Sequence, residues 1–168
     1  MKAHMTKGTI DFLQKLAEKN PDQNIKLMQS NEGGLAYYEH SPKKLFQSGR
    51  TFEILEETGV ILQNGYVVMN NIPVAEESQP IFEDRFKKRK QAVENMPGFQ
   101  AFRLLRPEKG EIYVVLTQWA TKKHFEDWKA SDVFSEAHKN EAVKSSSYLF
   151  KNAYVADYMM YEEEEDQA

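Results

Sequence analysis

The order of strands and helices predicted for the second half of the chain constrains the fold most strongly. β-Branched residues predict strands, apolar residues near helical spacing predict helices, and a Glu-Lys-Gly turn joins two neighbouring strands. The predicted segments, in the order β-α-β-β-α-β, are 65–74, 78–98, 99–107, 111–119, 121–143 and 147–162. This order is typical of the ferredoxin-like arrangement, an α+β fold with an antiparallel sheet and helices on one face.

The last predicted helical segment contains a break. Thr121 can cap a first short helix, and the Ser131-Asp132 pair offers a new N-cap for a second one. On one uninterrupted helix, Trp128 and His138 would lie about 15 Å apart along the axis. We therefore predict two short consecutive helices, whose indole and imidazole line different parts of one flat ligand.

The first half of the chain reads as a weaker copy of the second. Its predicted strand, helix, hairpin and last strand lie at 2–8, 9–21, 24–40 and 47–59. The hairpin is expected to turn at Gly33-Gly34, and it resembles 101–119 in its basic-Leu start and aromatic second strand. No counterpart of the segment with Trp128 and His138 follows it. Duplication of one supersecondary unit and shared β-α-β-β patterning both explain the similarity.

Composition excludes several classes of protein. The chain has no cysteine, which excludes disulfides, thiolate catalysis, iron–sulfur clusters and cysteine-type zinc sites. No apolar run approaches the roughly 20 residues that span a bilayer, and the first residues lack the features of a signal peptide. The basic run 85–90 is flanked by acidic residues and is typical of a solvated helix face. We therefore expect a cytoplasmic protein that binds neither membranes nor nucleic acids.

The segment TQWATKKHFEDWKASDVFSEAHK, residues 117–139, resembles a family signature. A Trp-containing strand followed by D-W, S-D-V-F and A-H-K is similar to the pattern of the IsdG-type haem-degrading monooxygenases, in the antibiotic-biosynthesis-monooxygenase superfamily. The resemblance covers 65–156 and is closest to the longer, HmoB-type members, which carry an extra N-terminal segment.

The resemblance implies roles for three residues. His138 matches the family histidine that ligates haem iron, and Trp128 matches the tryptophan that presses on the porphyrin. The third member is an asparagine on the opening strand, whose amide can hydrogen-bond an oxygen on the iron. Asn70 and Asn71 are both candidates, and alternation along the strand puts them on opposite faces, with Asn70 on the face of Ile72. The family pattern, with its asparagine two residues before an aliphatic position, favours Asn70, on the face against the helices. The remaining histidines are expected to have no role in the chemistry: His4, His40 and His124.

The resemblance implies a haem monooxygenase. Haem would be both cofactor and substrate, and the enzyme would cleave the porphyrin with O₂ and release iron. The sequence has no flavin or nicotinamide motif, so electrons must come from an external donor or reductase. One alternative is a non-catalytic haem-binding or iron-handling protein that uses the same His138. Another is a cofactor-independent monooxygenase acting on a small aromatic compound.

The resemblance also predicts how the two halves assemble. Shorter family members form homodimers in which two sheets join into one barrel. We therefore predict a degenerate ferredoxin-like unit at 1–64, a complete haem-binding unit at 65–156, and a strand end with an acidic tail at 157–168. Together the two units would form a pseudo-dimeric β-barrel within a monomer. The alternative is a homodimer in which the first segment is a decoration.

Overall fold

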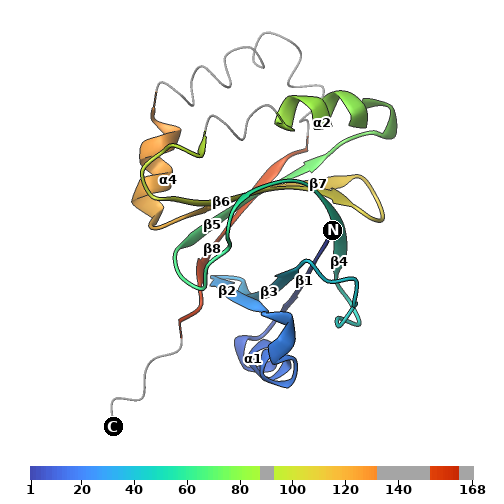
Figure 1. Cartoon of the computed structure of the whole chain (residues 1–168), viewed down its shortest axis with the longest axis vertical. Helices are drawn as coiled ribbons and strands as arrows, with labels where there is room; N and C mark the ends of the chain where they lie inside the picture. Colours follow the sequence, from blue (N-terminus) through green and yellow to red (C-terminus); the bar gives the residue numbers. More distant parts are fainter. Residues whose placement is uncertain (88–92, 132–151, 163–168) are drawn as a thin grey trace.

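A computed structural model describes residues 1–87, 93–131 and 152–162. The strands of these residues close into one antiparallel barrel, with helices outside it (Figure 1). In chain order the elements are β1 (Lys2–Gly8), α1 (Ile10–Lys19), η1 (Pro21–Gln23), β2 (Lys26–Ser30), β3 (Gly33–Glu39), β4 (Arg50–Gly59), β5 (Tyr66–Pro73), η2 (Glu76–Ser78), α2 (Gln79–Lys87), β6 (Phe99–Pro107), β7 (Ile112–Trp119), α4 (Lys122–Lys129) and β8 (Tyr154–Met160). None of the described helices has the length and apolar character needed to cross a membrane.

The barrel consists of two sheets with the same internal strand order. The first sheet has the order β4-β1-β3-β2 and the second has the order β8-β5-β7-β6. In each sheet the first strand of the unit lies between the third and the fourth, as in the ferredoxin-like arrangement. The closed order therefore confirms the prediction of two tandem α+β units that form a pseudo-dimeric barrel. The change from one unit to the other falls in the connection 60–65.

Two seams join the sheets, and they differ in length. β4 pairs with β6 over seven residue pairs, whereas β2 pairs with β8 over two, one of which joins Met28 to Met160. The side chain of Gln63 strengthens the short seam. Its Nε2 donates to the carbonyls of Leu27 (2.8 Å) and Tyr161 (2.9 Å). Its Oε1 accepts from the Leu27 amide at 3.2 Å.

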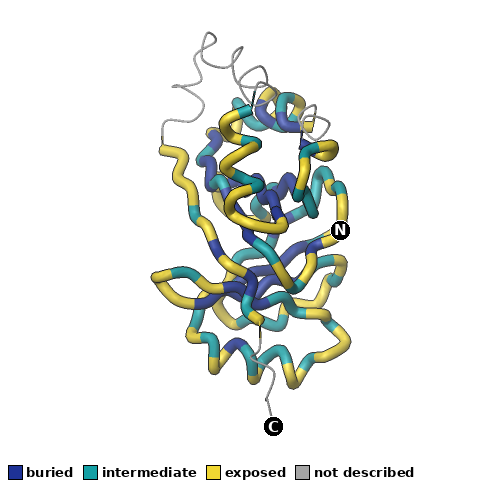
Figure 2. The backbone as a smooth tube through the Cα atoms, turned by 90° about the vertical axis from the view of Figure 1, so that its left-hand side faces the viewer, coloured by how far each residue is buried: buried dark blue, intermediate teal, exposed yellow. Residues whose placement is uncertain are grey.

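Apolar side chains form one layer inside the barrel and one outside each sheet. The interior layer includes Met5, Phe52 and Met69. Outside the second sheet, Phe82 of α2 belongs to a cluster against which α4 also packs, and outside the first sheet Leu13 of α1 belongs to a smaller cluster. Figure 1 shows α1 on the opposite side of the barrel from α2 and α4. In Figure 2 the buried residues concentrate along the strands.

The first hairpin turns two residues earlier than the sequence predicts. Ser30 pairs with Gly33, so Asn31 and Glu32 form the turn and the two glycines begin β3. The prediction that Gly33-Gly34 forms the turn was therefore wrong. A Cβ at Gly34 would lie 2.9 Å from the Gly8 carbonyl oxygen. The glycine is needed for this close approach of β3 to the end of β1, and not for the turn.

Two further features concern the ends of strands. Pro73 ends β5, which lies between β7 and β8, and the pairing of β5 with β8 stops at Asn71. The proline therefore coincides with the end of the pairing on the β8 side of this central strand. In the first unit, residues 40–49 connect β3 to β4 as an irregular segment. The second unit has α4 after the corresponding hairpin.

Candidate functional site

The two adjacent asparagines of β5 lie on opposite faces of the sheet. Met69 belongs to the barrel interior, whereas Ile72 belongs to the outer cluster beneath the helices. Asn71 is 2% exposed and points inward, where its Oδ1 accepts from Arg50 and its Nδ2 donates to the Met69 carbonyl. Asn70 therefore faces outward and is half-buried. The sequence prediction of the two faces is confirmed.

Trp128 lies on α4 and stacks against a second tryptophan. The Thr121 hydroxyl caps this helix by accepting from the His124 amide, as predicted. The ring centroids of Trp128 and Trp119 are 5.4 Å apart with an interplanar angle of 29°, and Phe125 lies 6.1 Å from each. These contacts fix the indole of Trp128 against the outer face of β7.

Trp119 is fully buried, and the sequence reasoning gave it no role of its own. Its Nε1 donates to Thr117 Oγ1 at 3.0 Å, so this indole is oriented by a hydrogen bond as well as by packing. The alternation of side chains along β7 could have placed Trp119 on the outer face of the sheet. Thr117 and Trp119 share the outer face with Tyr113 and Val115.

Two tyrosine–carboxylate pairs border this outer face. The Tyr66 hydroxyl donates to Asp157 Oδ2 at 2.6 Å, and the Tyr113 hydroxyl donates to Glu83 Oε2. Burial, and then the carboxylate partner, raises the pKa of Tyr66 and of Tyr113 well above the ordinary value. Both phenols therefore stay protonated near neutral pH and act as donors to fixed acceptors.

The second predicted helix, with His138, lies outside the described residues. Its role as an iron ligand therefore stays a prediction. Two other histidines have structural contacts: His4 is buried with Nδ1 3.0 Å from Thr51 Oγ1, and Nδ1 of His124 lies 2.8 Å from Thr121 Oγ1. Asn70 and Trp128 both lie on the outer face of the second sheet.

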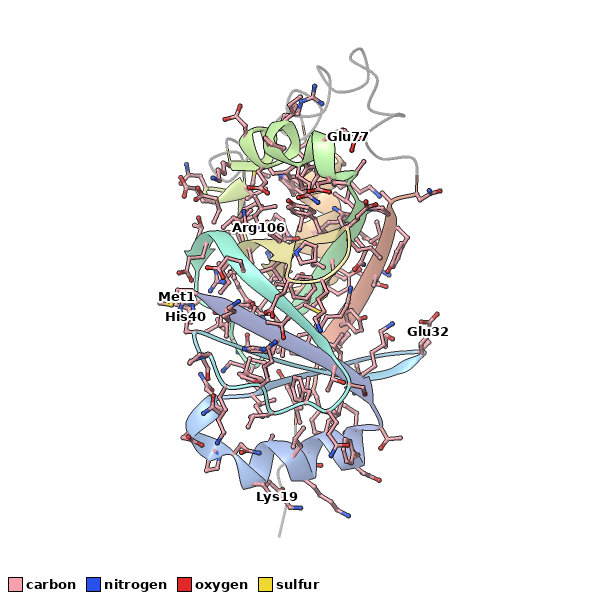
Figure 3. The ribbon with its side chains drawn as sticks, turned by 90° about the vertical axis from the view of Figure 1, so that its right-hand side faces the viewer. Met1, Lys19, Glu32, His40, Glu77 and Arg106 are labelled. Atoms are coloured by element: carbon pink, nitrogen blue, oxygen red, sulfur yellow. The ribbon has the colours of Figure 1, made fainter. Side chains whose placement is uncertain are left out.

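A separate polar group lies at one end of the barrel, and the sequence analysis did not find it. His40 Nε2 lies 3.4 Å from Glu39 Oε1 and 3.0 Å from Glu57 Oε2. His40 is labelled in Figure 3 close to Met1, and its amide donates to the carbonyl of Lys2. Glu39 also forms a two-point ion pair with the buried Arg103, at 3.0 and 2.9 Å.

A comparison with family models finds a match to the second unit of the barrel. Residues 65–140 match the model of the family described as antibiotic biosynthesis monooxygenase. The matched domain contains Asn70, Trp128 and His138, and it begins at the connection that leads into β5.

The relatives with similar sequences include a protein named as an enzyme and proteins named as signal transduction proteins. The chain is 29% identical over 135 residues to the heme-degrading monooxygenase of Listeria monocytogenes, which covers 80% of this chain and 81% of that protein. It is 23% identical over 136 residues to the signal transduction protein TRAP of Staphylococcus epidermidis, with 81% of each chain covered. The solved structure of a major regulator of staphylococcal pathogenesis has a TM-score of 0.86 at 23% identity, over 96% of this chain and 100% of that one. The structural likeness confirms the fold.

Proposed function

We propose that this protein is a haem-degrading monooxygenase that binds haem on the outer face of its second sheet. The observation that carries the proposal is the fixed position of Trp128, stacked on Trp119, on the same sheet face as Asn70. Both residues belong to the antibiotic biosynthesis monooxygenase domain. Similarity to the Listeria protein named heme-degrading monooxygenase supports haem as the substrate.

The described residues of this face suit a flat apolar macrocycle. Trp128 and Phe125 are the half-buried aromatic residues of this face, and the fully buried Trp119, Phe82 and Tyr113 form the rigid aromatic layer beneath them. Aromatic and aliphatic walls with few polar groups are typical of cofactor sites. Histidine is the common axial ligand of haem in a chain without cysteine, and we assign this role to His138.

Each residue has a distinct part in the proposed chemistry. When bound, haem supplies the activation of O₂ and is itself cleaved. Trp128 orients the macrocycle through a rigid apolar surface, and stacking on Trp119 holds the Trp128 indole in place. Asn70 offers an amide donor from the strand beneath. Electrons come from an external donor, because the sequence has no flavin or nicotinamide motif.

Titration with hemin, followed by a reductant in air, tests the proposal. The wild-type protein should bind one haem and lose its Soret band when ascorbate or a reductase is added. His138→Ala should bind haem far more weakly, because it lacks the iron ligand. His40→Ala is the matched control, since His40 lies at a barrel end among carboxylates, and it should behave as the wild type.

The relatives named as signal transduction proteins favour a second candidate, a haem-binding protein with no turnover. Stoichiometric binding with a Soret band that survives reductant and air would select it over the enzyme. An unchanged spectrum and affinity in His138→Ala would show that the ligand assignment is wrong. Absence of any haem binding would reject both candidates.

A further inference from the structure

Arg50 lies inside one mouth of the barrel, and no carboxylate within the described residues pairs with it. Its Nη1 donates to Asn71 Oδ1 at 3.4 Å, and its Nη2 lies 3.3 Å from the sulfur of Met5. Its guanidinium carbon lies 5.4 Å from the centroid of the Phe52 ring. Amide oxygens and thioethers carry no net charge and thioethers accept weakly, so the positive charge of this half-buried group is uncompensated.

Arg103 of β6 is another arginine in the barrel interior, next to the end of β4. Unlike those of Arg50, its N–H groups are all hydrogen-bonded within the protein. Its Nε and Nη2 bond both oxygens of Glu39, at 3.0 and 2.9 Å. Its remaining N–H groups reach the carbonyls of Thr58, Gly59 and Phe102. All five donors of Arg103 are therefore used, whereas Arg50 makes two contacts, both with uncharged acceptors. The difference indicates that the N–H groups of Arg50 can bind an acceptor from outside the chain.

A cavity of about 380 Å³ opens beside Arg50. Residues from β1, the irregular segment before β4, the start of β4 and the β6–β7 turn line it, and its apolar wall includes Phe46, Phe52 and Ile112. Small-molecule sites in proteins have volumes of roughly 300–1,000 Å³ and combine apolar walls with a few polar groups. The cavity has the size and the mixed lining of such a site.

The charges around this cavity favour an anion of low charge. The lining holds the cations Lys44, Arg50 and Lys109 and the carboxylates Glu108 and Glu111, which gives a formal charge of +1. Lys44 lies 2.9 Å from Glu108, so this pair is already neutralised at the rim. Arg50 is the cation that points inward to the apolar wall. One carboxylate group on the ligand would balance it.

We propose that this cavity binds a small monocarboxylate with a flat apolar body. The carboxylate pairs with the free N–H groups of Arg50, and the apolar body lies against Phe46 and Ile112. The site is distinct from the proposed haem face, because Asn71, which holds Arg50, points into the barrel while Asn70 points out. The proposal therefore stands independently of haem degradation.

Calorimetric titration of the full-length protein with benzoate tests this site, with benzamide as the neutral analogue and inorganic phosphate as an anion without an apolar body. Benzoate should bind at least about tenfold more tightly than benzamide, because a charge-assisted pair with Arg50 is lost in the amide. Arg50→Gln should weaken benzoate binding at least about tenfold. Arg106→Gln is the matched control, since Arg106 pairs with Glu83 and does not line the cavity.

Asn71→Asp provides a second variant should Arg50→Gln fold poorly. A carboxylate at this position would lie beside Arg50 Nη1, neutralise it internally and lower benzoate affinity, while phosphate stays the weaker ligand throughout. Equal binding of benzoate and benzamide would overturn the proposal. So would tighter binding of phosphate than benzoate, absence of benzoate binding to the wild type, or unchanged benzoate affinity in the variants.

Discussion

The two units of the barrel share a strand order and differ in what covers their outer faces. In the first unit, α1 covers a small cluster around Leu13, and an irregular segment, 40–49, follows the hairpin. In the second unit, α2 and α4 cover a larger aromatic cluster that includes Phe82, Tyr113 and Trp128. The equivalent sheets therefore support different surfaces.

This difference separates the residues that close the barrel from those that cover the outer face of its second sheet. Both sheets are needed to enclose one interior, so the first unit retains its strand order and its inward apolar residues. Its outer face carries no counterpart of the stacked Trp119 and Trp128. A site can thus be built on one copy of a fold, while the other copy supplies the second half of the barrel.

Removal of residues 1–60 should change the protein most, because it leaves the second unit without the first. The remaining unit would expose the interior face of its sheet, which carries Met69, Leu105 and Leu116. An apolar surface of that kind leads to association. We expect the truncated protein to dimerise or aggregate, as measured by light scattering after size-exclusion chromatography. A stable monomeric fragment would show that the first unit is a decoration after all.

Glu39→Gln tests how tightly the two units are joined. Glu39 lies on β3 of the first unit and holds Arg103, on β6 of the second, which is 2% exposed. Loss of this partner should cost up to about 3 kcal/mol, because Glu57, whose Oε2 lies 3.7 Å from Arg103 Nε, compensates only part of the buried charge. Chemical denaturation measures the change. Glu53→Gln is the control, since its exposed pair with the N-terminus is worth less than about 1 kcal/mol.

The same ion pair predicts a dependence on pH. Burial alone would raise the pKa of Glu39, but the hydrogen bonds from Arg103 and Tyr37 outweigh it and hold the pKa below its ordinary value of 4.5. A lowered pKa in the folded state means that the contribution is complete above pH 4.5 and is lost as the pH falls below it. The stability difference between wild type and Glu39→Gln should therefore shrink in acid. If the stability difference does not change with pH, the effect of Glu39→Gln comes from packing and not from the charge.

Substitution of the neighbouring asparagines should separate the outer face from the interior. Asn70→Ala and Trp128→Ala should slow haem turnover and leave binding largely intact, because neither supplies the bond to iron. Asn71→Ala should leave turnover unchanged but lower stability by about 1–3 kcal/mol, since Arg50 and the Met69 carbonyl lose a partner. The assignment fails if Asn71→Ala is the variant with slow turnover.

The smallest effects are expected at the two threonine caps. Thr9 caps α1 in the first unit, and Thr121 caps α4 in the second. Each change to alanine should cost about 0.5–2 kcal/mol. Thermal denaturation should show similar losses for both variants, but only Thr121→Ala should also slow haem turnover, because α4 positions Trp128. Equal turnover in the two variants would show that the cap does not affect the site.

Local patterns were sufficient to predict most of the fold and part of the site. Alternation along β5 placed Asn70 outside and Asn71 inside, and the Thr121 cap correctly started α4. Local patterns failed at Gly34, whose role is to allow a close approach by a distant strand. A glycine pair has the same appearance in a sequence whether it makes a turn or a contact.

The polar interior could not be predicted, because it depends on barrel closure. Glu39 and Arg103 are 64 positions apart and belong to different units. Their pairing arises only once β4 meets β6 and the two sheets enclose a common space. Arg50 and Asn71 meet in the same way, from strands that are not neighbours in the barrel. No periodicity along one segment contains this information.

The unequal seams give the barrel a preferred place to open. Breaking the β2–β8 pairing disrupts two residue pairs and the bridge from Gln63, whereas breaking β4–β6 disrupts seven pairs. Local opening starts where the fewest contacts are lost, so amide hydrogen exchange should be fastest along the shorter seam. The seven pairs would keep the units joined during such an event. The protein can therefore loosen as an open curved sheet without separating into two halves.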